Sequence, residues 1–443
     1  MEPRTNYIWS EKPAGRLVRP AGFAICAMAA LLATTPTQAA TASSSSAAAE
    51  SSEFASGPQW VTSDQRAAIH LLALLQSAEL DGLEPGRFDV RSLARLLQSA
   101  IDGNWKNADR ANAAFNRALV DYVTALRSAP SPEWVIVDRS AVPPVPSASA
   151  LLAQAAAAPS LERWVDTMPF MHRGYAELRR ALAMARERGD AKSEALLRVN
   201  LNRMRFLPAD GRYVLVNTAA QQLYMYDGDR PVDSMKVVVG KPVNPTPMMA
   251  AMIRFTAVNP YWNVPVDLAA ERIAPHVVKE GTGYLEKLGY VVLSDWSDQA
   301  TPVDPASVDW AGVADGRVKI RVRQEPGPHN SMGRMKFMFP NPQGVYLHDT
   351  PDKELLNEAA RLFSGGCVRL EDAPRLAQWL YGAPLQIQTT QPEQPIDLDR
   401  PVPVYLAYLT AVPSDGQIVY YNDIYGTDRS EMAAVGDRRV AAN

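Results

Sequence analysis

The feature that most constrains the fold of this chain is a change of pattern at Pro208. Before this residue, apolar side chains recur at helical intervals, as at Ile69, Leu72, Leu75 and Leu80. After it, short runs rich in β-branched and aromatic residues alternate with turns, beginning with 212–217, 222–226 and 235–239. We therefore predict an α+β protein, in which a helical N-terminal domain precedes a mainly β domain.

The helical pattern is divided by a proline-rich segment. Helices are expected over 63–127, with turns inside that range, and over 161–165 and 175–201. Residues 139–150 contain three prolines among Ser and Ala, which is typical of a linker. We assign 61–205 to the helical domain, 206–390 to the β domain, and 391–443 to a proline-rich stretch, a final strand and a C-terminal tail.

The β domain is expected to carry an insertion. Residues 266–314 mix helix, best at 269–279, with loop, and we interpret them as a cap over the sheet rather than as more sheet. Another helix is expected at 373–380. The prolines of 391–403 favour an extended, non-sheet conformation. Further strands are expected at 253–258, 319–323, 344–347, 385–388 and 404–410.

The N-terminus has the pattern of an export signal. Arg16 and Arg19 precede an apolar run at 21–33, and small residues follow up to Ala42. Thirteen apolar residues are fewer than the ~20 that span a bilayer, which favours a cleaved signal over a permanent anchor, although an uncleaved anchor stays an alternative. We predict a signal peptide at 1–42 and a disordered leader at 43–60.

Charge and cysteine content exclude several functions. The net charge is -3 and the chain has no Lys/Arg-rich block, so we expect no nucleic-acid partner. The two cysteines are Cys26, inside the apolar signal run, and Cys367, so the exported protein would carry one thiol and no disulfide. Five scattered histidines offer no ligand pair at metal spacing, and we predict neither a metal site nor a cofactor.

Cys367 has the surroundings of a nucleophile. Gly365 and Gly366 before it give room for oxyanion-binding N–H groups, and His348 at the end of a predicted strand is the best candidate base. Ser364 could orient the histidine ring through its hydroxyl or its carbonyl. A lone cysteine is more often a small buried hydrophobe, and only these neighbours reverse that interpretation.

These residues carry a resemblance to a known family. His348, a spacer, and Ser-Gly-Gly-Cys-Val-Arg at 364–369 are similar to the signature of the L,D-transpeptidase (YkuD) family. Segments 259–265, 326–333 and 336–341 resemble its large proteobacterial branch, and 65–130 more loosely resembles the scaffold domain of that branch. The match covers about 199–425. The chain departs from the pattern at Gly365, where the family often has His or Ser, and we expect it to lack the branch's peptidoglycan-binding module.

The resemblance implies a periplasmic enzyme that joins peptidoglycan stem peptides through a thioester on Cys367. His348, Ser364 and Gly366 would complete the catalytic group. The implied product is a 3→3 diaminopimelate link, or a 1→3 link from L-Ala, as in shortened relatives that also have a proline-rich tail. The candidate substrate-binding residues are Arg369, Tyr346, Gly365, Asn330 and Trp262.

Alternative interpretations stay open. Water as the acceptor would make the same site an L,D-carboxypeptidase, and a non-catalytic peptidoglycan-binding protein would not need Cys367. A papain-like hydrolase fits poorly, because there the cysteine precedes the histidine. Arg369 could serve an ion pair, and Trp262 could pack the cap. We expect four further cations to be ordinary solvated charges on strand faces: Arg321, Arg323, Arg334 and Lys336.

Overall fold

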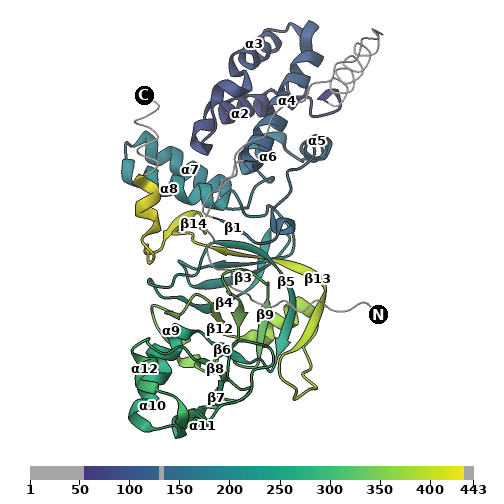
Figure 1. Cartoon of the computed structure of the whole chain (residues 1–443). Helices are drawn as coiled ribbons and strands as arrows, with labels where there is room; N and C mark the ends of the chain where they lie inside the picture. Colours follow the sequence, from purple (N-terminus) through teal and green to yellow (C-terminus); the bar gives the residue numbers. More distant parts are fainter. Residues whose placement is uncertain (1–53, 129–133, 434–443) are drawn as a thin grey trace, which may run out of the picture. The chain divides into compact units, whose positions relative to one another are not determined.

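The computed structural model describes residues 54–128 and 134–433 (Figure 1). The predicted signal peptide, most of the leader and Cys26 lie outside these residues. The described part has a helical N-terminal region and a mainly β C-terminal region, so the α+β prediction is confirmed. In this part of the chain no helix is long and apolar enough to cross a membrane.

The N-terminal region consists of helices that pack through apolar faces into one core. Several begin at a capping side chain: the Asp64 carboxylate accepts from Ala67 N, and the Asp190 carboxylate accepts from Ser193 N. The helices are α2 (Gln65–Gln76), α3 (Val90–Ile101), α4 (Ala108–Ser128), α5 (Ala148–Ala156), α6 (Leu161–Thr167), α7 (Tyr175–Glu187) and α8 (Ala191–Met204).

The last residues of the predicted leader belong to this helical core. Trp60 is fully buried, and its indole N–H donates to Asn116 Oδ1 on α4 over 2.7 Å. The Asn116 amide in turn donates to the Phe54 carbonyl over 2.8 Å. The prediction of a disordered leader is therefore wrong for 54–60, because an indole with a buried hydrogen-bond partner anchors that segment.

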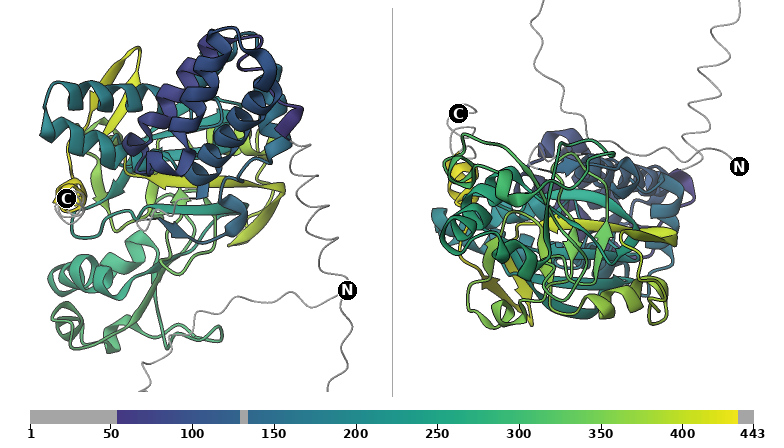
Figure 2. Two further views of the ribbon diagram at one scale, coloured as in Figure 1. Left: turned by 90° about the horizontal axis from the view of Figure 1, so that it is seen from above. Right: turned by 60° about the horizontal axis from the view of Figure 1, so that its bottom comes forward.

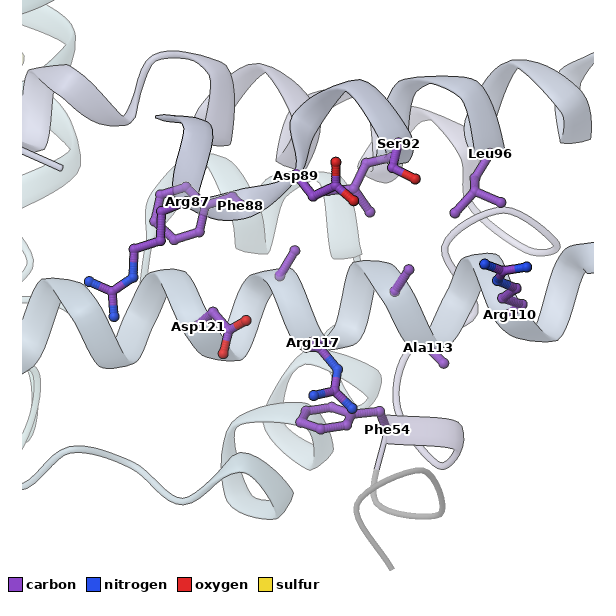
Figure 3. A pocket seen from close by; sticks show the side chains of 13 residues that line it. Phe54, Arg87, Phe88, Asp89, Ser92, Leu96, Arg110, Ala113, Arg117 and Asp121 are labelled. Atoms are coloured by element: carbon purple, nitrogen blue, oxygen red, sulfur yellow. The ribbon is translucent and has the colours of Figure 1, made fainter. Parts of the chain in front are cut away.

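The helical region has a polar hollow between α3 and α4 (Figure 3). Its volume is about 320 Å³, and the guanidinium of Arg117 lies 4.5 Å from the ring centre of Phe54. Burial raises the pKa of Asp121, while Arg117 and Arg87 oppose that rise. None of the predicted catalytic residues lines this hollow.

The C-terminal region is built on a ten-stranded sheet whose path is β1-β5-β13-β2-β3-β4-β12-β10-β9, with β11 beside β4. Because β9 also pairs with β5, the path closes on itself. Helix α13 (Ala373–Tyr381) packs on it. The strands are β1 (Val135–Ile136), β2 (Tyr213–Asn217), β3 (Gln222–Asp227), β4 (Arg230–Gly240), β5 (Met249–Val258), β9 (Met335–Met338), β10 (Leu347–His348), β11 (Leu362–Ser364), β12 (Val368–Leu370) and β13 (Gln394–Ala407).

Strand β13 corrects the prediction for the proline-rich stretch. It lies between β5 and β2, and the long β5–β13 pair is visible in Figures 1 and 2. Pro401 lies where the register with β5 shifts, between Asp397 and Val402, whereas Pro395 and Pro403 stay paired with β5. The strand expected at 385–388 is absent from the described residues, where this segment has no regular structure. Strand β13 is followed by a hairpin of β14 (Ala411–Ser414) and β15 (Gln417–Tyr420).

The predicted cap is a small subdomain with its own sheet. Strands β6 (Trp262–Val264), β8 (Arg321–Gln324) and β7 (Tyr290–Leu293) pair in that order, so the expectation that the insertion contains no sheet is wrong. A separate apolar core joins these strands to the helices. The helices, grouped near β7 and β8 in Figure 1, are α9 (Val266–Leu268), α10 (Ala274–Glu280), α11 (Gly283–Leu288) and α12 (Trp310–Ala314).

Two side chains of α8 join the helical region to the sheet. Asn200 Oδ1 accepts from the Thr410 and Ala411 N–H groups over 2.7 and 3.1 Å. Arg203 is fully buried, donates to the Tyr408 carbonyl over 2.9 Å, and pairs with Asp428 over 2.6 Å. The end of β13 and the segment after β15 are thereby held against α8.

Candidate active site

Three strands place a row of ionisable side chains on one face of the sheet. His348 on β10 is directly opposite Lys336 on β9 and directly opposite Arg369 on β12. Residues paired in this way point to the same face. His348 therefore lies between two cations, and it is only 1% exposed.

Cys367 and Tyr346 extend this patch. Each lies two residues before a member of the row, Cys367 before Arg369 and Tyr346 before His348, so alternation along the strands favours the same face. The rings of Tyr346 and His348 are 5.8 Å apart, edge to face. Hydrogen bonding from Tyr346, by its side chain and its backbone, lowers the pKa of the Cys367 thiol, which also approaches the Gly344 carbonyl at 3.6 Å.

The histidine ring is held by a neighbouring carbonyl. His348 Nδ1 lies 2.6 Å from the Asp349 carbonyl, which can only accept, so Nδ1 carries the proton and Nε2 is left with its lone pair. Burial, followed by the charge of Arg369, lowers the pKa of His348 to about 3. The ring is a neutral base at ordinary pH.

The thiol is neutral as well. Burial raises the pKa of Cys367 to about 11, although Tyr346 and the charges of Arg369 and Lys336 oppose that rise. The free protein thus holds a neutral thiol and a neutral imidazole on the same face of the sheet.

Ser364 does not hold the histidine as we expected. Its hydroxyl donates to the Cys367 carbonyl over 2.5 Å and accepts from Gly366 N over 3.1 Å, while its carbonyl accepts from Lys241 N over 3.0 Å. Ser364 therefore fixes the turn that carries Cys367. Because Gly366 N is engaged in this way, the Cys367 N–H is the better placed oxyanion donor in the free protein.

The turn before Cys367 requires glycine at one position. Gly366 has φ of +119°, which L side chains rarely adopt. Its carbonyl accepts from Thr246 Oγ1 over 2.8 Å, and that hydroxyl accepts from Gly240 N over 2.9 Å. Thr246 thus connects the end of β4 to the catalytic turn.

The five predicted substrate-binding residues have different surroundings. Tyr346 contacts the thiol, and Gly365 lies under Leu268 of the cap, whose Cδ1 would be 3.8 Å from an added Cβ. Arg369 lies in the row and forms an ion pair with Asp352 over 3.1 Å, which is the alternative role that the sequence left open. Its charge still acts on the Cys367 thiol.

Asn330 and Trp262 pack the cap rather than face a substrate. Asn330 is 1% exposed, its amide donates to three carbonyls, and its Oδ1 accepts from Met332 N. Trp262 is 9% exposed within the cap's apolar core. Both were predicted to contact substrate, and the structure instead gives them a packing role.

Sequence reasoning missed the role of Lys336. We expected a solvated charge, but its ammonium is buried, pairs with Glu393 Oε1 over 2.8 Å and lies 5.8 Å from the centre of the Tyr346 ring. The alternating pattern Met-Lys-Phe-Met correctly puts the lysine opposite the apolar face. No sequence signal shows that β10 pairs with β9 and so places His348 beside Lys336 on that face.

No cluster of His, Cys, Asp and Glu able to hold a metal ion occurs among residues 54–128 and 134–433. The chemistry that the site offers on its own is acyl transfer. A sulfur nucleophile, a neutral base with a free lone pair, and a backbone N–H at a glycine turn are the groups that such a reaction needs.

Comparison with known proteins agrees with this chemistry. A family model described as the L,D-transpeptidase catalytic domain (YkuD) matches residues 211–404, and a Scaffold domain model matches residues 53–182. A Haemophilus influenzae protein provisionally named an L,D-transpeptidase is 36% identical over 243 residues. That match covers 53% of this chain and 48% of the relative, about half of its length.

Proposed function

Since this chain belongs to the L,D-transpeptidase (YkuD) family, we propose that it cross-links peptidoglycan stem peptides through a thioester on Cys367. The observation that carries the proposal is the shared face of Cys367, Tyr346 and His348, in which the histidine is fixed as a neutral base. The family indicates the reaction class, and the arrangement of Cys367, Tyr346 and His348 indicates the role of each side chain in that reaction.

The first half of the reaction acylates the enzyme. The Cys367 sulfur attacks a carbonyl of the donor stem, and His348 Nε2 takes the thiol proton. The Cys367 N–H donates to the oxyanion that forms. His348 then returns the proton to the leaving amine, which departs as the C–N bond breaks, and a thioester remains. Within the described part of the free protein no hydrogen bond joins Nε2 to the sulfur, and such catalytic contacts often form only in the substrate-bound site.

The second half transfers the acyl group. An amine of the acceptor stem attacks the thioester, the new amide bond forms, the C–S bond breaks, and the proton lost by the amine returns to sulfur through His348. No nucleoside triphosphate is consumed, since the donor amide supplies the acyl group. The cap, through Leu268 above Gly365, would exclude the water that otherwise competes with the amine.

The bond that is formed distinguishes two products. Attack at the L-centre of diaminopimelate gives a 3→3 link, and attack at the L-Ala carbonyl gives a 1→3 link. We propose one of these two, and further that the enzyme works in the periplasm, on the basis of the export signal predicted at 1–42.

The test is mass spectrometry of muropeptides incubated with the purified protein. We expect cross-linked dimers from the wild type and none from Cys367→Ala, with both proteins equally folded by circular dichroism. The fragment released from the donor identifies the linkage. Trimmed monomers without dimers would indicate a carboxypeptidase, and dimers from Cys367→Ala would overturn the proposal.

A further inference from the structure

The cap contains an irregular helical turn beside the catalytic strand. Residues Ala269–Ile273, between α9 and α10, form a π-helical turn. Such turns are rare and occur frequently at functional sites, because they re-aim side chains. This one carries Arg272, whose Nη2 lies 3.5 Å from the Phe363 carbonyl, next to Ser364. Leu268 before the turn lies above Gly365, so two independent contacts place the turn over the catalytic loop.

The charges around this turn do not balance. Arg272 is near enough to Arg369 that its charge contributes to a lowered pKa of that guanidinium, after the larger effect of burial. Arg369 has one carboxylate partner, Asp352, whose side chain is 46% exposed. Within the described ranges, no carboxylate lies within ion-pair distance of Arg272, and Arg369 Nε is buried without a hydrogen-bond partner.

The other two ionisable groups of the patch, Lys336 and His348, do not offset the excess positive charge of Arg272 and Arg369. Lys336 is already paired with Glu393 over 2.8 Å. His348 is neutral and adds no charge. At the edge of the nucleophile's patch, Arg369 therefore has one half-exposed carboxylate partner, and Arg272 has none within ion-pair distance among the described residues. An anion with planar geometry is the partner that such a pair binds best.

We propose that Arg272 and Arg369 together bind the free C-terminal carboxylate of the donor peptide, and that Arg272 is a specificity-determining residue contributed by the cap. This inference rests on the proposed function, because it names the group that the donor must carry. The cap would then do more than exclude water. A donor with the carboxylate would draw the π-turn onto the catalytic loop, whereas a neutral donor would leave Arg272 unpaired.

The first test does not depend on peptidoglycan at all. Iodoacetate and iodoacetamide both alkylate Cys367, with a new S–C bond, release of iodide and loss of the thiol proton, but only iodoacetate carries a carboxylate. The ratio of their rates at Cys367 is read by mass spectrometry of the peptide that contains it. We expect Arg272→Gln to lower the iodoacetate-to-iodoacetamide ratio by about fivefold, the effect of one partly screened charge.

Matched variants separate charge from structure. Arg272→Lys should keep much of the ratio. Lys279→Gln, which removes a charge from the exposed surface of the same cap, should leave it unchanged. If Arg272→Gln does not fold, the wild-type ratio should still fall with added salt, since screening weakens a charge interaction. A ratio unchanged both by Arg272→Gln and by salt would overturn the proposal.

The second test uses donors. A stem tetrapeptide and the same peptide with a C-terminal amide are compared at equal concentrations. We expect the wild type to have an about tenfold higher KM for the amide, and Arg272→Gln to raise KM for the acid alone while kcat changes little. Equal KM values for acid and amide in the wild type would contradict carboxylate recognition. If no donor is turned over by any form of the protein, the proposed function fails instead, and the alkylation ratio still reports on the arginine pair.

Discussion

At the scale of single residues, the site depends on two ionisable groups, His348 and Cys367, that are neutral in the free protein. His348 is buried and Cys367 is partly buried, and the cations beside them, Arg369 and Lys336, lower the pKa of each. For the histidine this adds to the effect of burial, and for the thiol it opposes burial. The result is that the thiol and the imidazole are both neutral in the free protein, with no ion pair to break before the reaction.

This state predicts how thiol reactivity depends on pH. A thiolate–imidazolium pair would give alkylation by iodoacetamide that is constant between pH 5 and 8. With the pKa of Cys367 raised to about 11 and that of His348 lowered to about 3, the rate should instead rise steadily through this range. The alkylation rate at each pH is measured by quenching the reaction and quantifying the modified protein by mass spectrometry. Tyr346→Phe, which removes a hydrogen bond to sulfur, should shift the curve to higher pH. A flat profile would show that the resting site is an ion pair.

The sequence predicted the partners Cys367 and His348, because a glycine turn and a strand end are local features. It could not predict the row Lys336–His348–Arg369, since that row depends on the register of three strands. For the same reason the orienting acceptor was assigned to Ser364 rather than to the Asp349 carbonyl. A backbone carbonyl has no sequence signal.

At the scale of elements, the catalytic turn is held by strand ends and by the loop after β4. Thr246 accepts from Gly240 at the end of β4 and donates to Gly366 before β12. The predictions at this scale succeeded where periodicity was strong, as in α4 and α13. They failed for β13, in which Pro401 lies at a register shift, and for the cap, whose short strands β6, β8 and β7 form a sheet of their own.

Thr246→Val tests this support. The substitution keeps the shape but leaves the Gly366 carbonyl and the Gly240 N–H without their partner, at a cost of about 1–2 kcal/mol in the free energy of unfolding. Because the turn also aims the Cys367 N–H, we expect acylation of Cys367 to slow by at least about tenfold, more than the stability loss explains. Urea unfolding and single-turnover acylation measure the two effects. Thr167→Val, at an exposed helix position, is the control, and equal rates in the two variants would contradict a role in aiming the turn.

At the scale of the whole molecule, α8 ties the helical region to the sheet through buried polar contacts. Arg203 contacts Tyr408, Asp428 and Glu431, and its guanidinium lies 5.1 Å from the Tyr408 ring centre. Composition and pattern predicted two regions with the right fold classes. The sequence did not predict this junction, because an arginine within a helix is usually interpreted as a solvated charge.

The variant Arg203→Met tests how much this junction contributes to the stability of the protein. Removing one partner of a buried ion pair leaves the carboxylates uncompensated, so we expect the free energy of unfolding to fall by about 3 kcal/mol. Arg188→Met, at the exposed end of α7, should change it by less than about 0.5 kcal/mol. Thermal and urea unfolding of both variants give the comparison. A loss no larger for Arg203→Met than for Arg188→Met would show that the junction contributes little to stability.

The central claim is that Cys367 carries the acyl group, and intact-protein mass spectrometry tests it most directly. The protein is mixed with a donor stem peptide without an acceptor, and the reaction is stopped in acid, where a thioester survives. We predict that the mass rises by that of the donor minus its leaving group, that the addition maps to Cys367, and that hydroxylamine removes it. Turnover of the donor by Cys367→Ala, or an adduct on another residue of the wild type, would contradict the account.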